Sequence, residues 1–143
     1  MYTKVKCGPT AYFDVDDTLV MWDMPEGIDL QNDSQVVTVE CRGRESYVYR
    51  NRYNIDLLIK MASRGHAIVV WSAGGADWAE AVVKALHLEN IVDVVTGKAT
   101  YYIDDLADPA KVLGKHGYFD INGKRADTDT YAHKEKTFEE PNS

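Results

Sequence analysis

Short apolar runs that end abruptly in polar residues recur along this chain. Residues 10–15 are β-branched and aromatic and end among carboxylates, and the apolar run 67–71 leads into Ser72-Ala73-Gly74-Gly75. Two further runs, 91–95 and 100–103, end at Thr96-Gly97-Lys98 and at Asp104-Asp105. Runs of this kind predict buried strands that deliver polar groups at their carboxyl ends.

The segments between these runs have a helical period. Apolar residues recur at three- and four-residue spacing over 54–63 and again over 77–86. Alternating strands and helices predict a parallel sheet with right-handed crossovers. Because 143 residues suffice for one such core, we predict a single Rossmann-like α/β domain, its sheet flanked by helices. The aromatic residues expected in its core are Trp71, Trp78, Tyr101 and Tyr102.

The remaining segments carry turn signals. Residues 35–41 and 46–50 flank a turn at 42–45 and predict an antiparallel β-hairpin, which follows a turn-rich loop over 21–34. Farther along, 109–116 predicts a short helix with Asp108 as its N-cap, and 117–121 predicts a last strand. The domain is therefore expected to span residues 1–121, and residues 122–143 to form a polar tail.

Composition and charge limit the classes of function. The chain is 45% apolar and 27% charged and has no apolar run near the ~20 residues of a membrane span, so we expect no membrane partner. Its first residues do not resemble a signal peptide, which favours a cytoplasmic location. A net charge of −7 argues against extended nucleic-acid binding, while a nucleotide, a nucleic-acid end or a homo-oligomer stays open. Four arginines form a local basic patch: Arg42, Arg44, Arg50 and Arg52.

Polar residues at the carboxyl ends of parallel strands converge at one edge of a sheet. In this sequence they are Asp14, Asp16, Ser72, Lys98, Asp104 and Asp105. Clustered carboxylates repel one another unless a cation lies between them, and an all-oxygen set favours Mg²⁺. With Mg²⁺ and Lys98 offsetting the charge, an anionic nucleophile can attack a phosphoryl group, which the Ser72 hydroxyl is placed to hold.

Taken in order, these motifs resemble those of the haloacid dehalogenase-like hydrolase superfamily. The resemblance covers about residues 10–116 and rests on Asp14-Val15-Asp16-Asp17-Thr18, on Ser72 after Ile-Val-Val-Trp, on Lys98, and on Ile103-Asp104-Asp105. It implies a Mg²⁺-dependent phosphomonoesterase in which Asp14 becomes an aspartyl-phosphate and Asp16 is the general acid and base. It also implies that Asp14, the backbone carbonyl of Asp16 and Asp105 hold the metal, with Asp104 as accessory.

The stretch between the first two motifs is short. About 53 residues separate Thr18 from Ser72, which leaves room for the hairpin as a flap but not for a cap domain. The resemblance implies that capless relatives act on large substrates, including nucleic-acid ends and phosphoproteins. We expect the residues that contact substrate to be Thr18, Ser72, Ala73, Gly74, Arg42 and Arg44.

Two other functions stay open from the residues alone. A receiver-like signalling module also accepts phosphate on an aspartate at a sheet edge. Its lysine comes last, however, whereas here Lys98 precedes Asp104. A phosphate-binding protein without turnover would keep the same motifs and use the hairpin to engage a partner.

Overall fold

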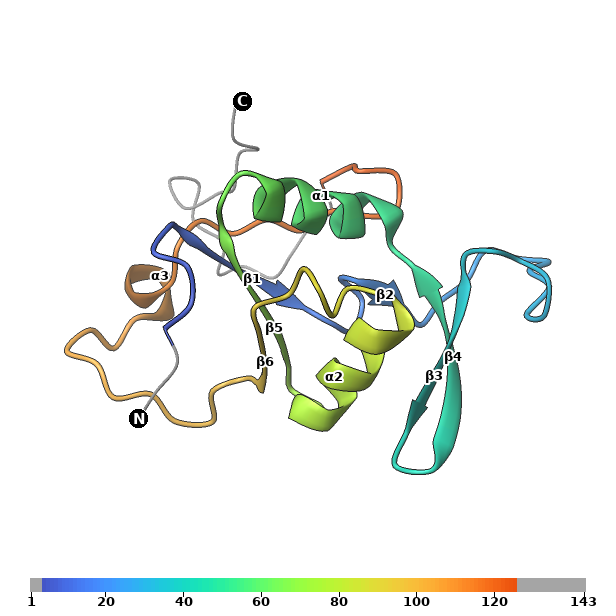
Figure 1. The fold of residues 1–143 in the computed structure, drawn as a ribbon, viewed down its shortest axis with the longest axis horizontal. Helices are drawn as coiled ribbons and strands as arrows, with labels where there is room; N and C mark the ends of the chain where they lie inside the picture. Colours follow the sequence, from blue (N-terminus) through green and yellow to red (C-terminus); the bar gives the residue numbers. More distant parts are fainter. Residues whose placement is uncertain (1–3, 126–143) are drawn as a thin grey trace.

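A three-stranded parallel sheet forms the base of the fold in this computed structural model, which describes residues 4–125 (Figure 1). Its strands are β1 (Thr10–Asp14), β5 (Ala67–Ser72) and β6 (Val94–Gly97), in the order β1-β5-β6. The register pairs Asp14 with Trp71 and Ser72 with Gly97, so the three strands end at the same edge. The predicted strands 10–15 and 67–71 are confirmed, and the run 91–95 forms a strand that begins three residues later.

Two helices pack with this sheet into one core. They are α1 (Arg52–Ser63), capped by the side chain of Asn51, and α2 (Ala76–Ala85). Successive side chains of a strand point to opposite faces, and Phe13, Ile68 and Val70 share a cluster with residues of both helices. The opposite face carries Tyr12, which is 54% exposed. The predicted α/β class and both predicted helices are confirmed.

A second, antiparallel sheet stands beside the first. It is built from β2 (Val20–Met21), β3 (Val36–Cys41) and β4 (Arg44–Arg50), in the order β2-β4-β3. Arg42 and Gly43 both have positive φ angles, of 54° and 74°, as a two-residue type I′ turn requires. The predicted hairpin is confirmed with this tighter turn, and Figure 1 shows it projecting beside α2 at one end of the molecule.

The expected strand at 100–103 is wrong. Residues 98–108 form an irregular loop that leaves the end of β6 and extends away from α2 (Figure 1). Only Lys98 and Ala99 separate β6 from residue 100, whereas a further parallel strand needs a crossover of a dozen or more residues. The expected core positions of Tyr101 and Tyr102 are wrong for the same reason, since these side chains are 87% and 49% exposed.

The end of the described chain is less regular than expected. Helix α3 (Pro109–Val112) is shorter than the predicted 109–116, because the backbone is already extended at Leu113. Its predicted N-cap is confirmed: the Asp108 carboxylate accepts a hydrogen bond from the Ala110 amide. The strand expected at 117–121 is reduced to one bridge, between Phe119 and Arg125. Most of the predicted tail, residues 126–143, lies outside the described part. No helix among residues 4–125 is long and apolar enough to cross a membrane.

Candidate active site

The loop after β1 is folded tightly on its own backbone. The carbonyl of Val15 accepts hydrogen bonds from the amides of residues 18, 19 and 20, at 3.2, 3.0 and 3.2 Å. Val15 and Leu19 are fully buried and anchor the loop in the core. The Thr18 carbonyl accepts a hydrogen bond of 2.9 Å from the side chain of Asn54 on α1. The polar residues of this loop therefore stand on a rigid support.

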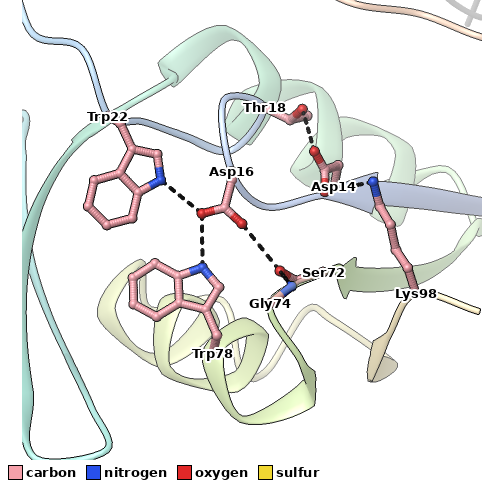
Figure 2. A network of polar contacts seen from close by, with 8 residues as sticks. All are labelled: Asp14, Asp16, Thr18, Trp22, Ser72, Gly74, Trp78 and Lys98. Atoms are coloured by element: carbon pink, nitrogen blue, oxygen red, sulfur yellow. Dashed lines mark hydrogen bonds and ion pairs between the residues drawn. The ribbon is translucent and has the colours of Figure 1, made fainter. Parts of the chain in front are cut away.

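Asp14 ends β1 with a carboxylate that is 31% exposed. Its Oδ1 lies 3.2 Å from Nζ of Lys98, and its Oδ2 accepts a hydrogen bond of 3.3 Å from the Thr18 hydroxyl (Figure 2). Lys98 follows β6 directly, and its amide donates to the Ser72 carbonyl. An accessible carboxylate beside a fixed cation is a group that can approach an anionic phosphate.

Asp16 has a different environment from Asp14. Its Oδ1 accepts hydrogen bonds from the indole N–H groups of Trp22, at 2.9 Å, and Trp78, at 3.1 Å, and its Oδ2 accepts one of 3.2 Å from the Ser72 hydroxyl. Figure 2 shows this carboxylate between the two tryptophans on one side and Ser72 on the other. Two neighbouring carboxylates thus differ in their partners, and such a difference can give two carboxylates of one site different chemical roles.

Ser72 is fully buried at the end of β5 and begins a narrow loop. Its hydroxyl accepts a hydrogen bond of 3.0 Å from the Gly74 amide while donating to Asp16. Gly75 has a φ angle of 107°, a conformation that favours glycine. Ala73 and Gly74 are exposed. The Ser72 hydroxyl, which the sequence predicts to hold phosphate, therefore faces the Asp16 carboxylate.

A cavity of about 1030 Å³ opens beside this edge of the sheet. Asp14, Asp16, Thr18 and Lys98 line it, together with the exposed face of β1 and residues 113–119. The convergence of strand ends that the sequence predicts is therefore seen for Asp14, Asp16, Ser72 and Lys98, three of which face a space that a substrate can enter.

Comparison with known proteins adds the family. The family model of the NLI interacting factor-like phosphatases, which are haloacid dehalogenase-like enzymes, matches residues 9–112. The chain is a member of this family. A search of curated proteins finds no match. The resemblance inferred from the motifs is thereby confirmed, and the protein is a phosphatase. The receiver-like and non-catalytic alternatives lose their support.

Two predicted metal ligands lie elsewhere in this phosphatase. Asp104 and Asp105 are exposed on the loop after β6, and neither lines the cavity. The Asp104 carboxylate accepts a hydrogen bond only from the nearby Leu106 amide among the contacts of the described chain. Within residues 4–125, no three His, Cys, Asp or Glu side chains are grouped closely enough to hold a metal. The structure thus brings Asp14 and Asp16 together and leaves Asp104 and Asp105 apart from them.

Arg42 reaches from the hairpin tip to the loop after β5. Its guanidinium bonds both carboxylate oxygens of Asp77, each at 2.6 Å, and the Gly74 carbonyl at 3.1 Å. The hydrogen bond from Arg42 lowers the pKa of Asp77, and the same bond raises the pKa of Arg42. Arg44, the other arginine expected to contact substrate, is exposed at the start of β4. Arg42 therefore holds the hairpin against α2.

Two residues of the site were missed from the sequence. Trp22 falls in the predicted loop 21–34, where nothing marks it as a neighbour of Asp16. Trp78 lies on the apolar face of a helix and was predicted as a core residue, and it does pack partly against the core. An indole has an apolar body and one polar N–H, so a tryptophan only six residues after Asp16 is a signal for the Trp22 contact. Trp78 is 62 residues from Asp16 and has no such signal.

Proposed function

We propose that this phosphatase hydrolyses phosphate monoesters through a phosphoryl group transferred to Asp14. The observation that carries the proposal is the pair of carboxylates with unlike partners: Asp14 beside Lys98 and Thr18, and Asp16 among three hydrogen-bond donors. We infer from these unlike partners that Asp14 attacks phosphorus and that Asp16 transfers a proton. Family membership supports the reaction class, while these roles are the proposal.

In the first step, a carboxylate oxygen of Asp14 forms a bond to phosphorus as the bond from phosphorus to the leaving oxygen breaks. Lys98 offsets the charge of Asp14, so the dianionic substrate is not repelled. The leaving oxygen takes the electron pair of the broken bond and a proton from Asp16. The products are an aspartyl-phosphate at Asp14, the free alcohol, and Asp16 as a carboxylate.

In the second step, water attacks the phosphorus of the aspartyl-phosphate. Asp16 accepts a proton from this water, the bond between phosphorus and Asp14 breaks, and inorganic phosphate leaves. Both side chains then return to their starting states. The two indole N–H groups at Oδ1 and the Ser72 hydroxyl at Oδ2 hold the Asp16 side chain beside the reaction centre.

The donor set at the site fits Mg²⁺. Mg²⁺ uses one or two carboxylates together with water and substrate phosphate, and the Asp14 carboxylate with the backbone carbonyl of Asp16 offers such oxygen ligands. Both oxygens of the Asp16 side chain already accept hydrogen bonds, which favours its carbonyl as the ligand. When bound, the ion neutralises charge on the phosphoryl oxygens.

The substrate side of the site is open. A cavity of about 1030 Å³ slightly exceeds the roughly 300–1,000 Å³ typical of ligand pockets, and no domain covers it in the described chain. A nucleotide or the phosphorylated end of a larger molecule fits a site of this kind better than a small sugar phosphate does. Arg44 is exposed at the start of β4 but does not line this cavity, so its expected contact with substrate stays a prediction.

The decisive experiment measures phosphate release with Mg²⁺ from a panel of nucleotides, sugar phosphates, phosphopeptides and 3′-phosphorylated DNA. Wild-type protein should release phosphate from at least one member, and acid quenching should trap labelled phosphate on the protein. Asp14→Asn should abolish both signals, whereas Asp56→Asn on the solvent side of α1 should change neither. Turnover that survives in Asp14→Asn would refute the nucleophile.

A further inference from the structure

Two tryptophans converge on one oxygen of the proposed general acid. The Nε1 atoms of Trp22 and Trp78 lie 2.9 and 3.1 Å from Oδ1 of Asp16 (Figure 2). The two rings stack on each other, with centroids 5.8 Å apart and planes 15° apart. Neither tryptophan lines the cavity beside Asp14. Their N–H groups therefore bind Asp16 and do not face the cavity that a substrate enters.

The chemistry of the donors makes the two oxygens of Asp16 unequal. An indole N–H can donate a hydrogen bond but cannot accept one, so Oδ1 must remain an acceptor in every step. Oδ2 faces the Ser72 hydroxyl, which can turn its proton and act either as donor or as acceptor. A proton carried by Asp16 therefore belongs on Oδ2.

The two tryptophans come from separate parts of the fold. Trp22 follows β2, and its amide donates to the Asp17 carboxylate at 3.3 Å, which ties it to the loop of the first motif. Trp78 lies in the first turn of α2, next to Asp77, the partner of Arg42. The orientation of the Asp16 carboxylate thus depends on the position of α2 and of the segment after β2.

We propose that Trp22 and Trp78 are positioning residues that fix the Asp16 carboxylate so that Oδ2 exchanges the proton with the leaving oxygen. This inference rests on the proposed function. As the bond between phosphorus and the leaving oxygen breaks, the leaving oxygen takes the electron pair and the proton from Oδ2, while Oδ1 keeps both indole hydrogen bonds. Asp16 is then a carboxylate, ready to take a proton from water through the same oxygen.

The test compares two leaving groups in variants that keep an aromatic ring but lose the N–H: Trp22→Phe and Trp78→Phe. General acids contribute on the order of 10²–10⁴-fold, and poor leaving groups need them most. We expect kcat/KM for an alkyl phosphate to fall about tenfold or more in each variant. For p-nitrophenyl phosphate, whose leaving oxygen needs little protonation, the loss should stay below about threefold.

Equal losses for both substrates in a folded variant would overturn the inference, because they would indicate general damage to the site. The same substitutions are repeated in Asp16→Asn, where there is no acid left to orient. There they should add almost nothing, since residues acting through one group are not additive. If the fold losses of a tryptophan variant and of Asp16→Asn multiply in the double variant, the inference is also overturned.

A second measurement needs no turnover. The chain has three tryptophans, so its indole N–H groups give a small set of resolvable signals in a ¹H–¹⁵N spectrum. Asp16→Ala should shift the signals of Trp22 and Trp78 and leave that of Trp71 in place. Unmoved signals would overturn the contact itself. A wild-type protein that releases no phosphate would instead overturn the proposed function, so the two failures are distinguishable.

Discussion

Replacing Lys98 with alanine removes a positive charge beside the proposed nucleophile. Its Nζ lies 3.2 Å from Oδ1 of Asp14. At that distance two unit charges interact by about 1.3 kcal/mol at the dielectric constant of water and by about 5 kcal/mol at an effective value near 20. The two side chains are 39% and 31% exposed, so solvent screening places the effect in the lower half of that range. A loss of about 2–3 kcal/mol corresponds to a fall in kcat/KM of roughly 30- to 150-fold.

The assay is phosphate release from the best substrate of the panel, with urea denaturation as a check on folding. Lys84→Ala is a matched control, because Lys84 also pairs with a carboxylate, Glu80 at 3.0 Å, but on the outer face of α2. Lys84→Ala should keep full activity and lose less than about 1 kcal/mol of unfolding free energy, since exposed ion pairs contribute little. Lys98→Ala should lose no more unfolding free energy than the about 2–3 kcal/mol of its own pair. A Lys98→Ala protein with more than a third of wild-type activity would refute the role of this charge.

Three further predictions concern the supports of the site. Asn54→Ala removes a donor to the Thr18 carbonyl and should lower the unfolding free energy by about 1–3 kcal/mol in urea denaturation. It should also lower kcat, because the loop that carries Asp16 and Thr18 loses this support. Gly75→Ala places a Cβ 3.0 Å from Asp77 Oδ1 at a φ of 107°, so we expect slower turnover and a looser hairpin, measured by proteolysis at the tip. Because Arg42 lowers the pKa of Asp77, their pairing stabilises the fold above the ordinary aspartate pKa and is lost as pH falls through the lowered value. Amide signals of residues 41–44 should therefore move below about pH 4 in the wild type and stay fixed in Arg42→Ala.

The position of the site could be predicted because it follows from the strand period and from parallel topology. Asp14, Ser72 and Lys98 each come at or just after a strand end, and parallel strands bring such ends to one edge. The sequence records this pattern locally, within a few residues of each strand. The same local signal predicted the hairpin and both long helices.

The contacts that refine the site could not be predicted in this way. Trp78 and Asp16 are 62 residues apart, and Arg42 and Asp77 are 35 apart. Such pairs depend on how α2 and the hairpin are placed in space, and a single sequence does not encode that placement in any local pattern. The failed strand at 100–103 has a different cause: its apolar residues fit a strand, but two residues after β6 are too few for a parallel crossover.

The metal role of Asp105 stays a prediction, and Asp104 supplies the control for it. Both are exposed on the loop after β6, where the Asp104 carboxylate is engaged by the Leu106 amide within its own turn. Ile103 beside them is fully exposed, so few apolar contacts hold this loop in place and its displacement toward Asp14 costs little. If Asp105 ligates Mg²⁺ as the resemblance implies, Asp105→Asn should raise the Mg²⁺ concentration for half-maximal phosphate release about tenfold or more, and Asp104→Asn much less. Equal and unaltered Mg²⁺ requirements in both variants would show that the ion is held without this loop, by Asp14 and the backbone of the first motif.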